Sequence, residues 1–481
     1  MFENLCKDKN YCNFYNGEWV PSSKGETIDI LSPVDGSLVG TVQAMTKADV
    51  DRAIEGTKLS REWADMPVYA RANVFNKAAL LLEEHADELA EVIVMEIAKD
   101  RRSAKSEVLR TADFLRFTAD VGKSLGGEAL TGDHFPGGSK NKLSYVTRVP
   151  LGTILAISPF NYPVNLSVSK IAPALIGGNS VVLKPPTQGA ISALYLVRIL
   201  EEAGLPAGAL NTITGRGRDI GDYVVTHPGI NFINFTGSSE VGHHIAKLAG
   251  MVPLLLELGG KDAAIVLPDA DLEFAAENIV SGAYSYSGQR CTAVKRILVV
   301  DSVADELAER LKAHVEKLAV GDPRGDVVIV PLIDSKAADF VQSLIDDALQ
   351  RGAKLLTGNR REGTLLYPTL LDHVTTDMDL AWKEPFGPVL PIIRVKDKDE
   401  AIAIANRSEY GLQSSVFTRD IGDAFYVANR LEVGTVQING KTERGPDHFP
   451  FLGVKSSGQG TQGVRYSIEA MTRPRAVVVN L

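Results

Sequence analysis

Between residues 151 and 257 the sequence alternates short apolar segments with longer helical ones, and this rhythm restricts the possible folds more than any other feature. The apolar segments have the length and β-branched character of buried strands, and each is followed by a stretch long enough for a helix. They read "TILAI", "SVVLK", "LNTIT", "INFINF" and "PLLLEL". The pattern predicts a doubly wound parallel α/β sheet, which binds ligands at the carboxyl ends of its strands.

A second block, from about residue 258 to 456, shows the same alternation through "DAAIVL", "RILVV", "SSVFT" and "GTVQIN". Two strand-like segments, "KLSYVTRV" within residues 128–149 and "RPRAVVVNL" within residues 457–481, have no partner nearby in sequence. We expect both to supply sheet edges to a neighbouring subunit. The predicted fold class is α/β: two doubly wound parallel-sheet domains plus a small β oligomerisation arm.

Local signals mark the elements before the first block. Asn16-Gly17 and Asp35-Gly36 stand between strand-like residues and predict hairpin turns. Thr46 with Asp49 predicts a capping box, and residues 68–126 carry apolar residues at helical spacing. We place the first domain at residues 1–127 and 150–257, the second at 258–456, and the arm and C-terminal segment at 128–149 and 457–481.

Composition excludes several classes of protein. The 481 residues include 51 basic and 60 acidic side chains, a net charge of -9 without long single-sign runs, so nucleic acid and anionic membrane are not expected partners. The opening segment lacks the features of a signal peptide, and no apolar run reaches the length of a membrane span. Only three cysteines occur, Cys6, Cys12 and Cys291, without metal or disulfide spacing. We expect a soluble cytoplasmic protein without a metal site.

Cys291 lies in "YSYSGQRCTAVKR", after a polar turn and before basic residues. An isolated cysteine is most often a small buried hydrophobic residue. A metal-binding role lacks partners, because His243 and His244 are adjacent instead of one helical turn apart. A nucleophilic role requires a thiolate, and Arg290 and Lys295 would help to lower its pKa. This stretch alone leaves the structural and nucleophilic readings open.

Two polar residues at the ends of predicted strands favour the nucleophile. Glu257 ends "PLLLEL" with glycines after it, and Asn161 follows "TILAI" between two prolines. A nucleophile, a carboxylate base and an amide donor at one sheet edge form a plausible catalytic site. Each has an ordinary alternative, since Asn161 suits a turn and Glu257 suits a structural ion pair.

Two glycine patterns compete for a nucleotide phosphate. "FTGSSEVG" follows a predicted strand and opens a helix, so Gly237 and Ser238 lie where free helix-start amides would face phosphate. "GRGRDIG" is a weaker near-match with one residue too many. Lys184, at the end of "SVVLK", and Thr187 replace the acidic residue that NAD-binding folds use, and this favours NADP. A solvated surface lysine is the alternative for Lys184.

The motifs "SPFNYP", "FTGS", "ELGGKD", "GQRC" and "EPFGPV" occur in the order and spacing of the aldehyde dehydrogenase superfamily, which the chain resembles from about residue 14 to its end. The resemblance implies that Cys291 attacks an aldehyde and that Asn161 and the Cys291 N–H hold the oxyanion. It implies that Glu257 activates water to hydrolyse the thioester, and that Glu384 and Phe386 hold the nicotinamide ribose and ring. It also implies that residues 1–127 and 150–257 bind the cofactor, that residues 258–456 form the catalytic domain, and that the chain forms a homotetramer.

Within this superfamily the chain is most similar to the NADP-dependent, non-phosphorylating glyceraldehyde-3-phosphate dehydrogenases, through segments such as "EVGTVQINGKTERGPDHFPFLGVKSSG" and "YSIEAMT". That likeness implies oxidation of D-glyceraldehyde 3-phosphate to 3-phosphoglycerate, with the phosphate held by Arg110, Tyr162, Arg290 and Arg444. A surface ion-pair ladder with the neighbouring acids at 107 and 113 is the alternative for Arg110, and a solvated loop is the alternative for Arg444.

Three other functions remain possible from the residues. A semialdehyde dehydrogenase, for example one that oxidises succinate semialdehyde, would use the same chemistry. A cysteine hydrolase would need a histidine base, for which no motif is present. A non-catalytic member of the fold would not need Cys291, Glu257 and Asn161.

Overall fold

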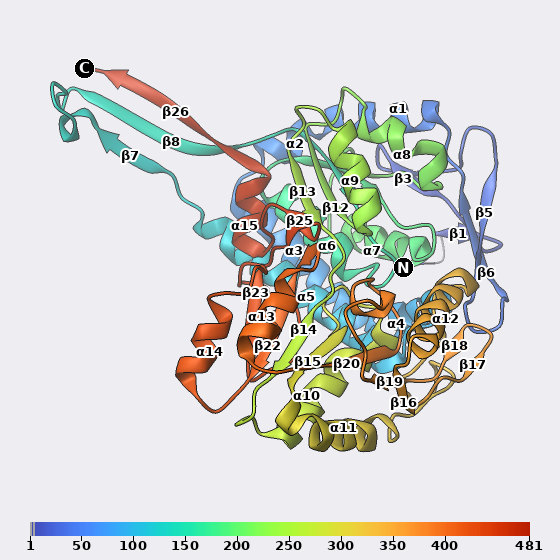
Figure 1. Ribbon diagram of the computed structural model, residues 1–481. Coiled ribbons are helices and arrows are strands. Elements are labelled where there is room, and N and C mark those ends of the chain that lie inside the picture. Colours follow the sequence, from blue (N-terminus) through green and yellow to red (C-terminus); the bar gives the residue numbers. More distant parts are fainter. Residues whose placement is uncertain (1, 3–4) are drawn as a thin grey trace.

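Strands and helices alternate through most of the computed structural model, which describes residue 2 and residues 5–481. Two separate sheets form the body, and a long β arm projects from it (Figure 1). The α/β class, with two mainly parallel sheets, is confirmed.

The first sheet has the strand order β11-β10-β9-β12-β13-β25. Its strands are β9 (Thr153–Ile157), β10 (Ser180–Lys184), β11 (Leu210–Thr212), β12 (Phe232–Thr236), β13 (Leu254–Glu257) and β25 (Gly458–Gln459). Neighbouring strands are parallel except β25, which is antiparallel to β13. The five strands expected from residues 151–257 are therefore all present, and their polar carboxyl ends lie along one edge.

Side-chain alternation buries both faces of this sheet. Ile154 and Ala156 of β9 join one apolar cluster, whereas Leu155 between them joins another. The first cluster includes α3 (Val68–Glu84), α4 (Ala86–Ile97), α5 (Arg101–Ser124), α6 (Asn165–Ile176) and α7 (Ala190–Glu202). The second includes α1 (Lys47–Glu55), α8 (Gly217–Val225) and α9 (Ser239–Leu248). Helices on both faces explain why the strands read as continuous apolar runs.

The second sheet has the order β16-β19-β20-β15-β14-β22-β23. The bounds are β14 (Ala263–Val266), β15 (Arg296–Val300), β16 (Lys354–Thr357), β19 (Thr369–Asp372), β20 (Val389–Val395), β22 (Gln413–Phe417) and β23 (Thr435–Ile438). Only β16 pairs antiparallel. One face packs on α10 (Leu272–Tyr284) and α11 (Asp301–Val315), and the other on α12 (Ser335–Gln350), α13 (Lys398–Asn406) and α14 (Ile421–Ala428).

The connection between the two sheets is short. β13 ends at Glu257 and β14 begins at Ala263, so the carboxyl edge of the first sheet lies beside the amino edge of the second. The loop that precedes β15 reaches the same place and carries Cys291. This junction brings together residues that come from both sheets.

The N-terminal predictions are confirmed. Asn16 and Gly17 have positive φ and join β3 (Asn13–Tyr15) to β4 (Glu18–Val20), as a tight hairpin requires. The loop with Gly36 joins β5 (Thr27–Leu31) to β6 (Leu38–Gln43), which pairs with β2 (Asn10–Tyr11); β2 in turn pairs with β1 (Cys6–Lys7). Thr46 and Asp49 form the reciprocal capping box of α1. The remaining short α-helices and strands are α2 (Arg61–Asp65), α15 (Val464–Ala470), β17 (Arg361–Glu362), β18 (Leu365–Leu366), β21 (Tyr410–Gly411) and β24 (Val454–Lys455).

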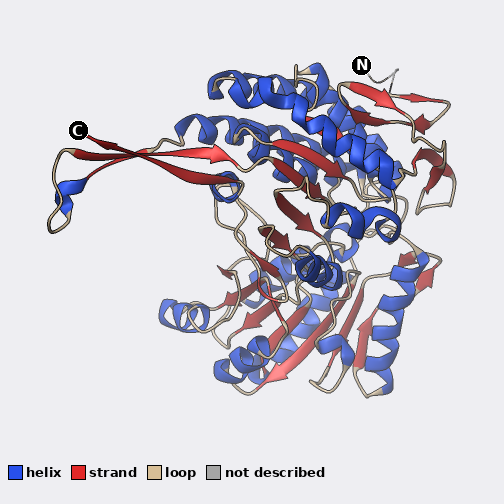
Figure 2. Ribbon diagram, turned by 90° about the horizontal axis from the view of Figure 1, so that it is seen from above, coloured by secondary structure: helices blue, strands red, loops and turns tan. Residues whose placement is uncertain are grey.

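The arm consists of β7 (Glu128–Thr131), β8 (Lys142–Pro150) and β26 (Thr472–Asn480). β26 pairs antiparallel with β8 along its whole length, so the strand without a partner nearby in sequence finds one far away in the same chain. The arm extends well beyond the body (Figure 2). Tyr145, Val477 and Val478 remain about half exposed on it. It therefore offers apolar surface and free strand edges.

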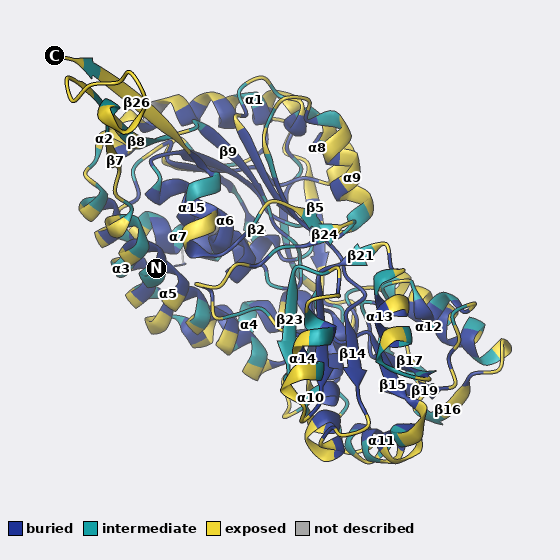
Figure 3. Cartoon of the chain, turned by 60° about the vertical axis from the view of Figure 1, so that its left-hand side comes forward, coloured by how far each residue is buried: buried dark blue, intermediate teal, exposed yellow. Residues whose placement is uncertain are grey.

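Burial follows this architecture. Most strands of both sheets are dark in Figure 3, whereas the edge strands β16 and β23 are partly exposed, and exposed residues gather on the outer faces of the helices and on the arm. Within the described part of the chain, no helix combines the length and apolar character that a membrane crossing requires.

Candidate active site

The turn that carries Cys291 has an unusual backbone. It follows a short helical turn, η3 (Ser285–Gly288), in which Tyr286 and Ser287 have φ values of 51° and 53°. Left-handed backbone is unfavourable for such residues and persists only where the surroundings hold it. The Tyr286 hydroxyl donates to the Ile97 carbonyl at 3.2 Å, and the Ser287 hydroxyl donates to the Val330 carbonyl at 2.7 Å. The turn is thereby fixed to both halves of the molecule.

Glu257 is the charged neighbour of the Cys291 thiol. It ends β13 with 1% of its surface exposed, and no nitrogen or oxygen donor of the described residues binds its two carboxylate oxygens, which leaves the Cys291 thiol as their interacting neighbour. Burial raises the pKa of the Cys291 thiol well above its usual range, and the Glu257 charge raises it further, while Lys295 and Arg444 oppose this. The expected assistance from Lys295 is present, but it does not outweigh burial and Glu257.

Asn161 faces the same turn from the first sheet. It follows β9, is 3% exposed, and its Nδ2 donates to the Gln289 carbonyl at 2.9 Å. An amide nitrogen carries two N–H groups, so one donor remains for a ligand beside Cys291. The structure thus brings together the three residues predicted as nucleophile, base and amide donor.

A cavity of about 830 Å³ opens at this site and runs along the carboxyl edge of the first sheet. Most of the residues predicted to bind the cofactor line it, namely Lys184, Gly237, Ser238, Glu384 and Phe386, and so do Cys291 and Asn161. Ser238 caps α9 by accepting a hydrogen bond from Val241 N–H. A long cavity that joins two helix starts to a thiol fits a dinucleotide.

Lys184 is buried, which excludes its interpretation as a solvated surface lysine. Burial lowers its pKa to about 8, so the ammonium remains the main form at pH 7, and its Nζ donates to the Gly215 carbonyl at 3.1 Å. Thr187 follows at the turn after β10 and is half-buried, outside the residues that line the cavity. Gly217 and Gly221 of the weaker glycine pattern line the same cavity as Gly237, because α8 and α9 begin side by side.

Glu384 is held in place by the chain itself. Lys295 Nζ lies 3.0 Å from its Oε1, and Gly260 N–H donates to the same oxygen at 3.2 Å. A Cβ at Gly259 would lie 2.2 Å from Glu384 Oε2, so a larger residue there would displace the Glu384 carboxylate. Lys295 also donates to the Cys291 carbonyl and so links the carboxylate to the cysteine turn.

The predicted phosphate ligands divide into two groups. Arg110 reaches Asp447 at 2.8 and 3.2 Å and donates to the Arg444 carbonyl at 3.0 Å, so these segments meet although they are far apart in sequence. Arg110 and Tyr162 line a second cavity of about 730 Å³. Arg290 instead points to the Gly282 carbonyl, to which its Nη2 donates at 2.5 Å.

Arg444 interacts electrostatically with Arg110 and with both Glu257 and Cys291. Its Nη1 is buried without a hydrogen-bond partner among the described residues, and its guanidinium lies 5.0 Å from the centre of the Phe451 ring. Burial lowers the pKa of Arg444, whereas Glu257 and Cys291 favour its charge. An unpaired buried N–H is costly, so this donor is suited to an anionic ligand.

Comparison with known proteins identifies the fold family. A model of the aldehyde dehydrogenase family matches residues 19–477. The chain belongs to the aldehyde dehydrogenase family. This confirms the resemblance found in the sequence motifs, and with it the aldehyde dehydrogenase fold.

Several similar members share one name. The chain is 56% identical over 474 residues to the NADP-dependent glyceraldehyde-3-phosphate dehydrogenase of Streptococcus equinus, with 98% of this chain and 99% of the relative covered. It is 49% identical to the wheat (Triticum aestivum) enzyme of that name, covering 100% and 97%. The crystal structure of the Bacillus halodurans C-125 enzyme, complexed with NADP, superposes with a TM-score of 0.97 at 55% identity and covers 98% and 99%.

Sequence reasoning missed one buried cation of this aldehyde dehydrogenase site. Lys170 lies in α6, donates to Thr236 Oγ1 at 2.7 Å, and is fully buried. Burial lowers its pKa to about 7, while the nearby Glu257 favours its charge. The signal was present, since Lys170 is the one charged residue in the apolar helix "NLSVSKIAPALI".

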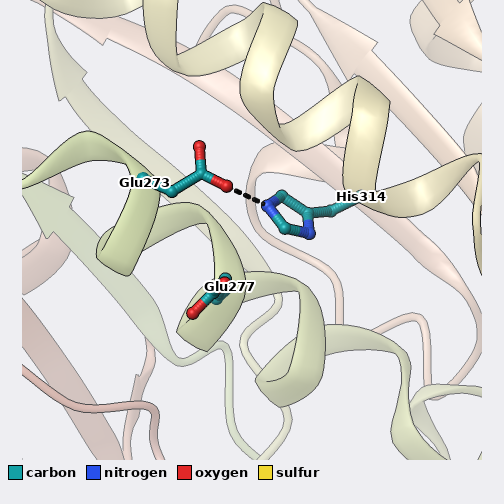
Figure 4. A group of neighbouring side chains, drawn as sticks. All are labelled: Glu273, Glu277 and His314. Carbon is teal, nitrogen blue, oxygen red and sulfur yellow. Dashed lines mark hydrogen bonds and ion pairs between the residues drawn. The ribbon is translucent and has the colours of Figure 1, made fainter.

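One group beside the second cavity, two of whose members (Glu277 and His314) line it, has metal-like spacing. The ligand atoms of Glu273, Glu277 and His314 lie within 4.8 Å of one another on α10 and α11 (Figure 4). Glu273 is already paired with Arg310 at 2.7 Å and with His314 at 2.8 Å. These contacts compensate its charge without an ion, and we assign none.

Proposed function

We propose that this aldehyde dehydrogenase oxidises D-glyceraldehyde 3-phosphate to 3-phosphoglycerate with NADP, without inorganic phosphate. The observation that carries the proposal is that Cys291 and Asn161 line a dinucleotide-sized cavity, while the buried Glu257 and Arg444, whose Nη1 has no partner among the described residues, both act on the Cys291 thiol. The names of full-length relatives at 49% to 56% identity support the same substrate and cofactor.

The reaction begins at the thiol. The Cys291 thiol gives its proton to Glu257, its Sγ adds to the aldehyde carbon, and the carbonyl oxygen becomes an oxyanion that Asn161 Nδ2 and the Cys291 N–H stabilise; Glu257 returns the proton to solvent before hydrolysis. NADP, when bound, accepts the hydride from that carbon. The product on the enzyme is a thioester between Cys291 and the acyl group.

Hydrolysis uses the carboxylate. Glu257 takes a proton from water, the hydroxide adds to the thioester carbon, and the C–S bond breaks to give the carboxylate product and free Cys291. The Glu257 oxygens fit this role, because no nitrogen or oxygen donor of the described residues is hydrogen-bonded to them. Water therefore replaces the inorganic phosphate that an acyl-phosphate-forming dehydrogenase would use.

The predicted cofactor residues fit NADP along the cavity. We assign Gly237 and Ser238 to the pyrophosphate, Lys184 with Thr187 to the 2′-phosphate, and Glu384 with Phe386 to the nicotinamide ribose and ring. The position of Thr187 beside the cavity rather than in its lining makes Lys184 the main determinant of NADP preference.

The phosphate group distinguishes this substrate from succinate semialdehyde, the alternative within the family. We assign its recognition to Arg110, Tyr162, Arg290 and Arg444, with Arg444 as the principal donor. A semialdehyde carboxylate also binds arginine, so only a comparison of phosphorylated and unphosphorylated aldehydes separates the two readings.

We also propose a homotetramer that acts in the cytoplasm. The half-exposed apolar side chains and the open strand edges of the β arm support association of subunits. A free thiol at Cys291 suits a reducing compartment. Light scattering of the purified protein measures the assembly directly.

The test is an assay for NADPH formation from D-glyceraldehyde 3-phosphate in a buffer without inorganic phosphate or coenzyme A. We expect NADPH and 3-phosphoglycerate in equal amounts, and no activity after Cys291→Ser. If folded protein with a titratable thiol forms no NADPH under these conditions, the proposed function is wrong. Turnover of succinate semialdehyde in the same buffer would select the alternative.

A further inference from the structure

A buried ion pair lies beneath the active site, apart from the groups assigned above. Lys99 occupies the short turn between α4 and α5, and its Nζ lies 2.7 Å from Glu107 Oε2. Neither side chain is exposed to solvent. A buried pair of this kind adds little stability, because the loss of hydration offsets most of the attraction. Its position therefore matters more than its strength.

Lys99 contacts the residues that flank the predicted oxyanion donor. Its Nζ donates to the Asn161 carbonyl at 2.9 Å and lies 3.3 Å from the centre of the Tyr162 ring. The same ammonium lies 4.9 Å from the centre of the Tyr286 ring, in the strained turn before Cys291. A cation over two aromatic faces attracts both. One charged group thus contacts the oxyanion segment and the nucleophile turn together.

Glu107 fixes the other end of the oxyanion segment. Its Oε1 accepts hydrogen bonds from the backbone N–H groups of Val164 and Asn165, both at 3.0 Å, where α6 begins. A carboxylate at a helix start is favourable, since it binds unpaired N–H groups. The pair therefore holds residues 161–165 at both ends, through Lys99 at the start and Glu107 at the finish.

We propose that Lys99, whose charge is balanced by the ion pair with Glu107, is a positioning residue that fixes the positions of the Asn161 amide and the Tyr162 ring relative to Cys291. The inference rests on the proposed function, because Asn161 there holds the oxyanion and Tyr162 contacts the substrate phosphate. Lys99 itself touches neither substrate nor cofactor. Without its ammonium, the Asn161 carbonyl and the Tyr162 ring lose their shared partner, and the amide donor shifts from its position beside the thiol.

The experiment compares Lys99→Met, which keeps length and removes the charge, with Lys99→Arg and Glu107→Gln. Lys105→Met is the matched control, because Lys105 lies on α5, the helix that carries Glu107, in a surface pair with Asp87, 45% and 82% exposed. Each variant is assayed with D-glyceraldehyde 3-phosphate and with unphosphorylated glyceraldehyde. All rates are divided by the concentration of titratable Cys291.

For Lys99→Met we expect kcat to fall at least about tenfold with both aldehydes, because a misplaced oxyanion donor affects both. KM should rise about fivefold for the phosphorylated aldehyde alone, because only that substrate uses the Tyr162 hydroxyl. Lys99→Arg should recover part of kcat, and Glu107→Gln should show the same pattern more weakly. Lys105→Met should match the wild type.

A second measurement is independent of turnover. In a crystal structure of Lys99→Met, the contact of 2.9 Å between Asn161 Nδ2 and the Gln289 carbonyl should be lengthened or lost. The inference is overturned if this contact is kept, or if kcat per thiol and the ratio of the two KM values are unchanged while only thermal stability falls. Wild-type protein that oxidises neither aldehyde would instead refute the proposed function.

Discussion

Replacing Arg444 with leucine tests the substrate assignment most directly. Its Nη1 is buried without a partner among the described residues, whereas Arg110 already spends two donors on Asp447. The free donor capacity of this cluster therefore belongs mainly to Arg444. Leucine keeps apolar contact with Phe451, over whose ring the guanidinium lies. The substitution thus removes charge and donors with little loss of packing.

The size of the effect follows from one hydrogen bond. A hydrogen bond to a charged group contributes about 1.5–3 kcal/mol, and about 1.4 kcal/mol corresponds to a factor of ten. We expect kcat/KM for D-glyceraldehyde 3-phosphate to fall roughly 10- to 150-fold. Unphosphorylated glyceraldehyde lacks the partner for that bond. Its kcat/KM should change by no more than about threefold, through the altered charge beside Cys291 and Glu257.

The assay measures initial NADPH formation with both aldehydes at saturating NADP, per titrated thiol. Arg419→Leu is the control, since that side chain is 71% exposed on the surface. If kcat/KM falls equally for both aldehydes, Arg444 supports the cysteine turn instead of binding phosphate. That result would favour the alternative that the enzyme is a semialdehyde dehydrogenase. Arg110→Leu should be less selective, because it also leaves Asp447 buried and unpaired.

Three further predictions follow from the buried groups. Glu257→Gln should form about one NADPH per Cys291 and then stop, because acylation persists without hydrolysis. Iodoacetamide should also alkylate the Cys291 thiol of this variant faster at pH 7, because a charge that raises the thiol pKa is gone. Unchanged steady-state turnover would contradict this prediction. Lys184→Ala should raise KM for NADP at least about tenfold and KM for NAD much less; equal increases would remove Lys184 from the 2′-phosphate. Burial lowers the pKa of Lys170 to about 7 in the folded state, against 10.5 in the unfolded chain, so between these pH values the unfolded chain binds more protons. The free energy of unfolding should therefore rise with pH across this range. Urea titrations at pH 7 and pH 9 should show a smaller rise in this free energy for Lys170→Met than for the wild type.

The strands and the proximity of Cys291, Glu257 and Asn161 could be predicted from sequence because both depend on local signals. Strands covered by helices on both faces are continuous apolar runs, and polar residues can follow them only where the run ends at the sheet edge. Asn161 and Glu257 stand at such ends, and Cys291 lies on the turn that enters the second sheet. Their proximity follows from the parallel winding of the sheet, which places the carboxyl ends of its strands along one edge.

The ion pairs could not be predicted, because helix orientation decides them. On α5 the sequence suggested that Arg110 pairs with Glu107 and Asp113, at helical spacing. In the structure Glu107 turns inward to Lys99, Asp113 contacts Arg116, and Arg110 crosses to a residue 337 positions away. Spacing along a helix shows which side chains are neighbours, whereas tertiary packing selects the partners.

The two half-reactions place opposite demands on the charge beside Cys291. Attack on the aldehyde needs a thiolate, which the Glu257 charge disfavours, whereas hydrolysis needs Glu257 as a carboxylate. Lys295 and Arg444 both oppose the effect of Glu257 on the pKa of the thiol. The Glu257 charge also favours the charged form of Lys170. In the proposed function Arg444 therefore has two effects, since the cation assigned to the substrate phosphate also favours the thiolate. Because Arg444 favours the thiolate, loss of its guanidinium should slow attack on the unphosphorylated aldehyde slightly instead of leaving it unchanged. A phosphorylated aldehyde that binds Arg444 would reduce the effect of Arg444 on the thiol.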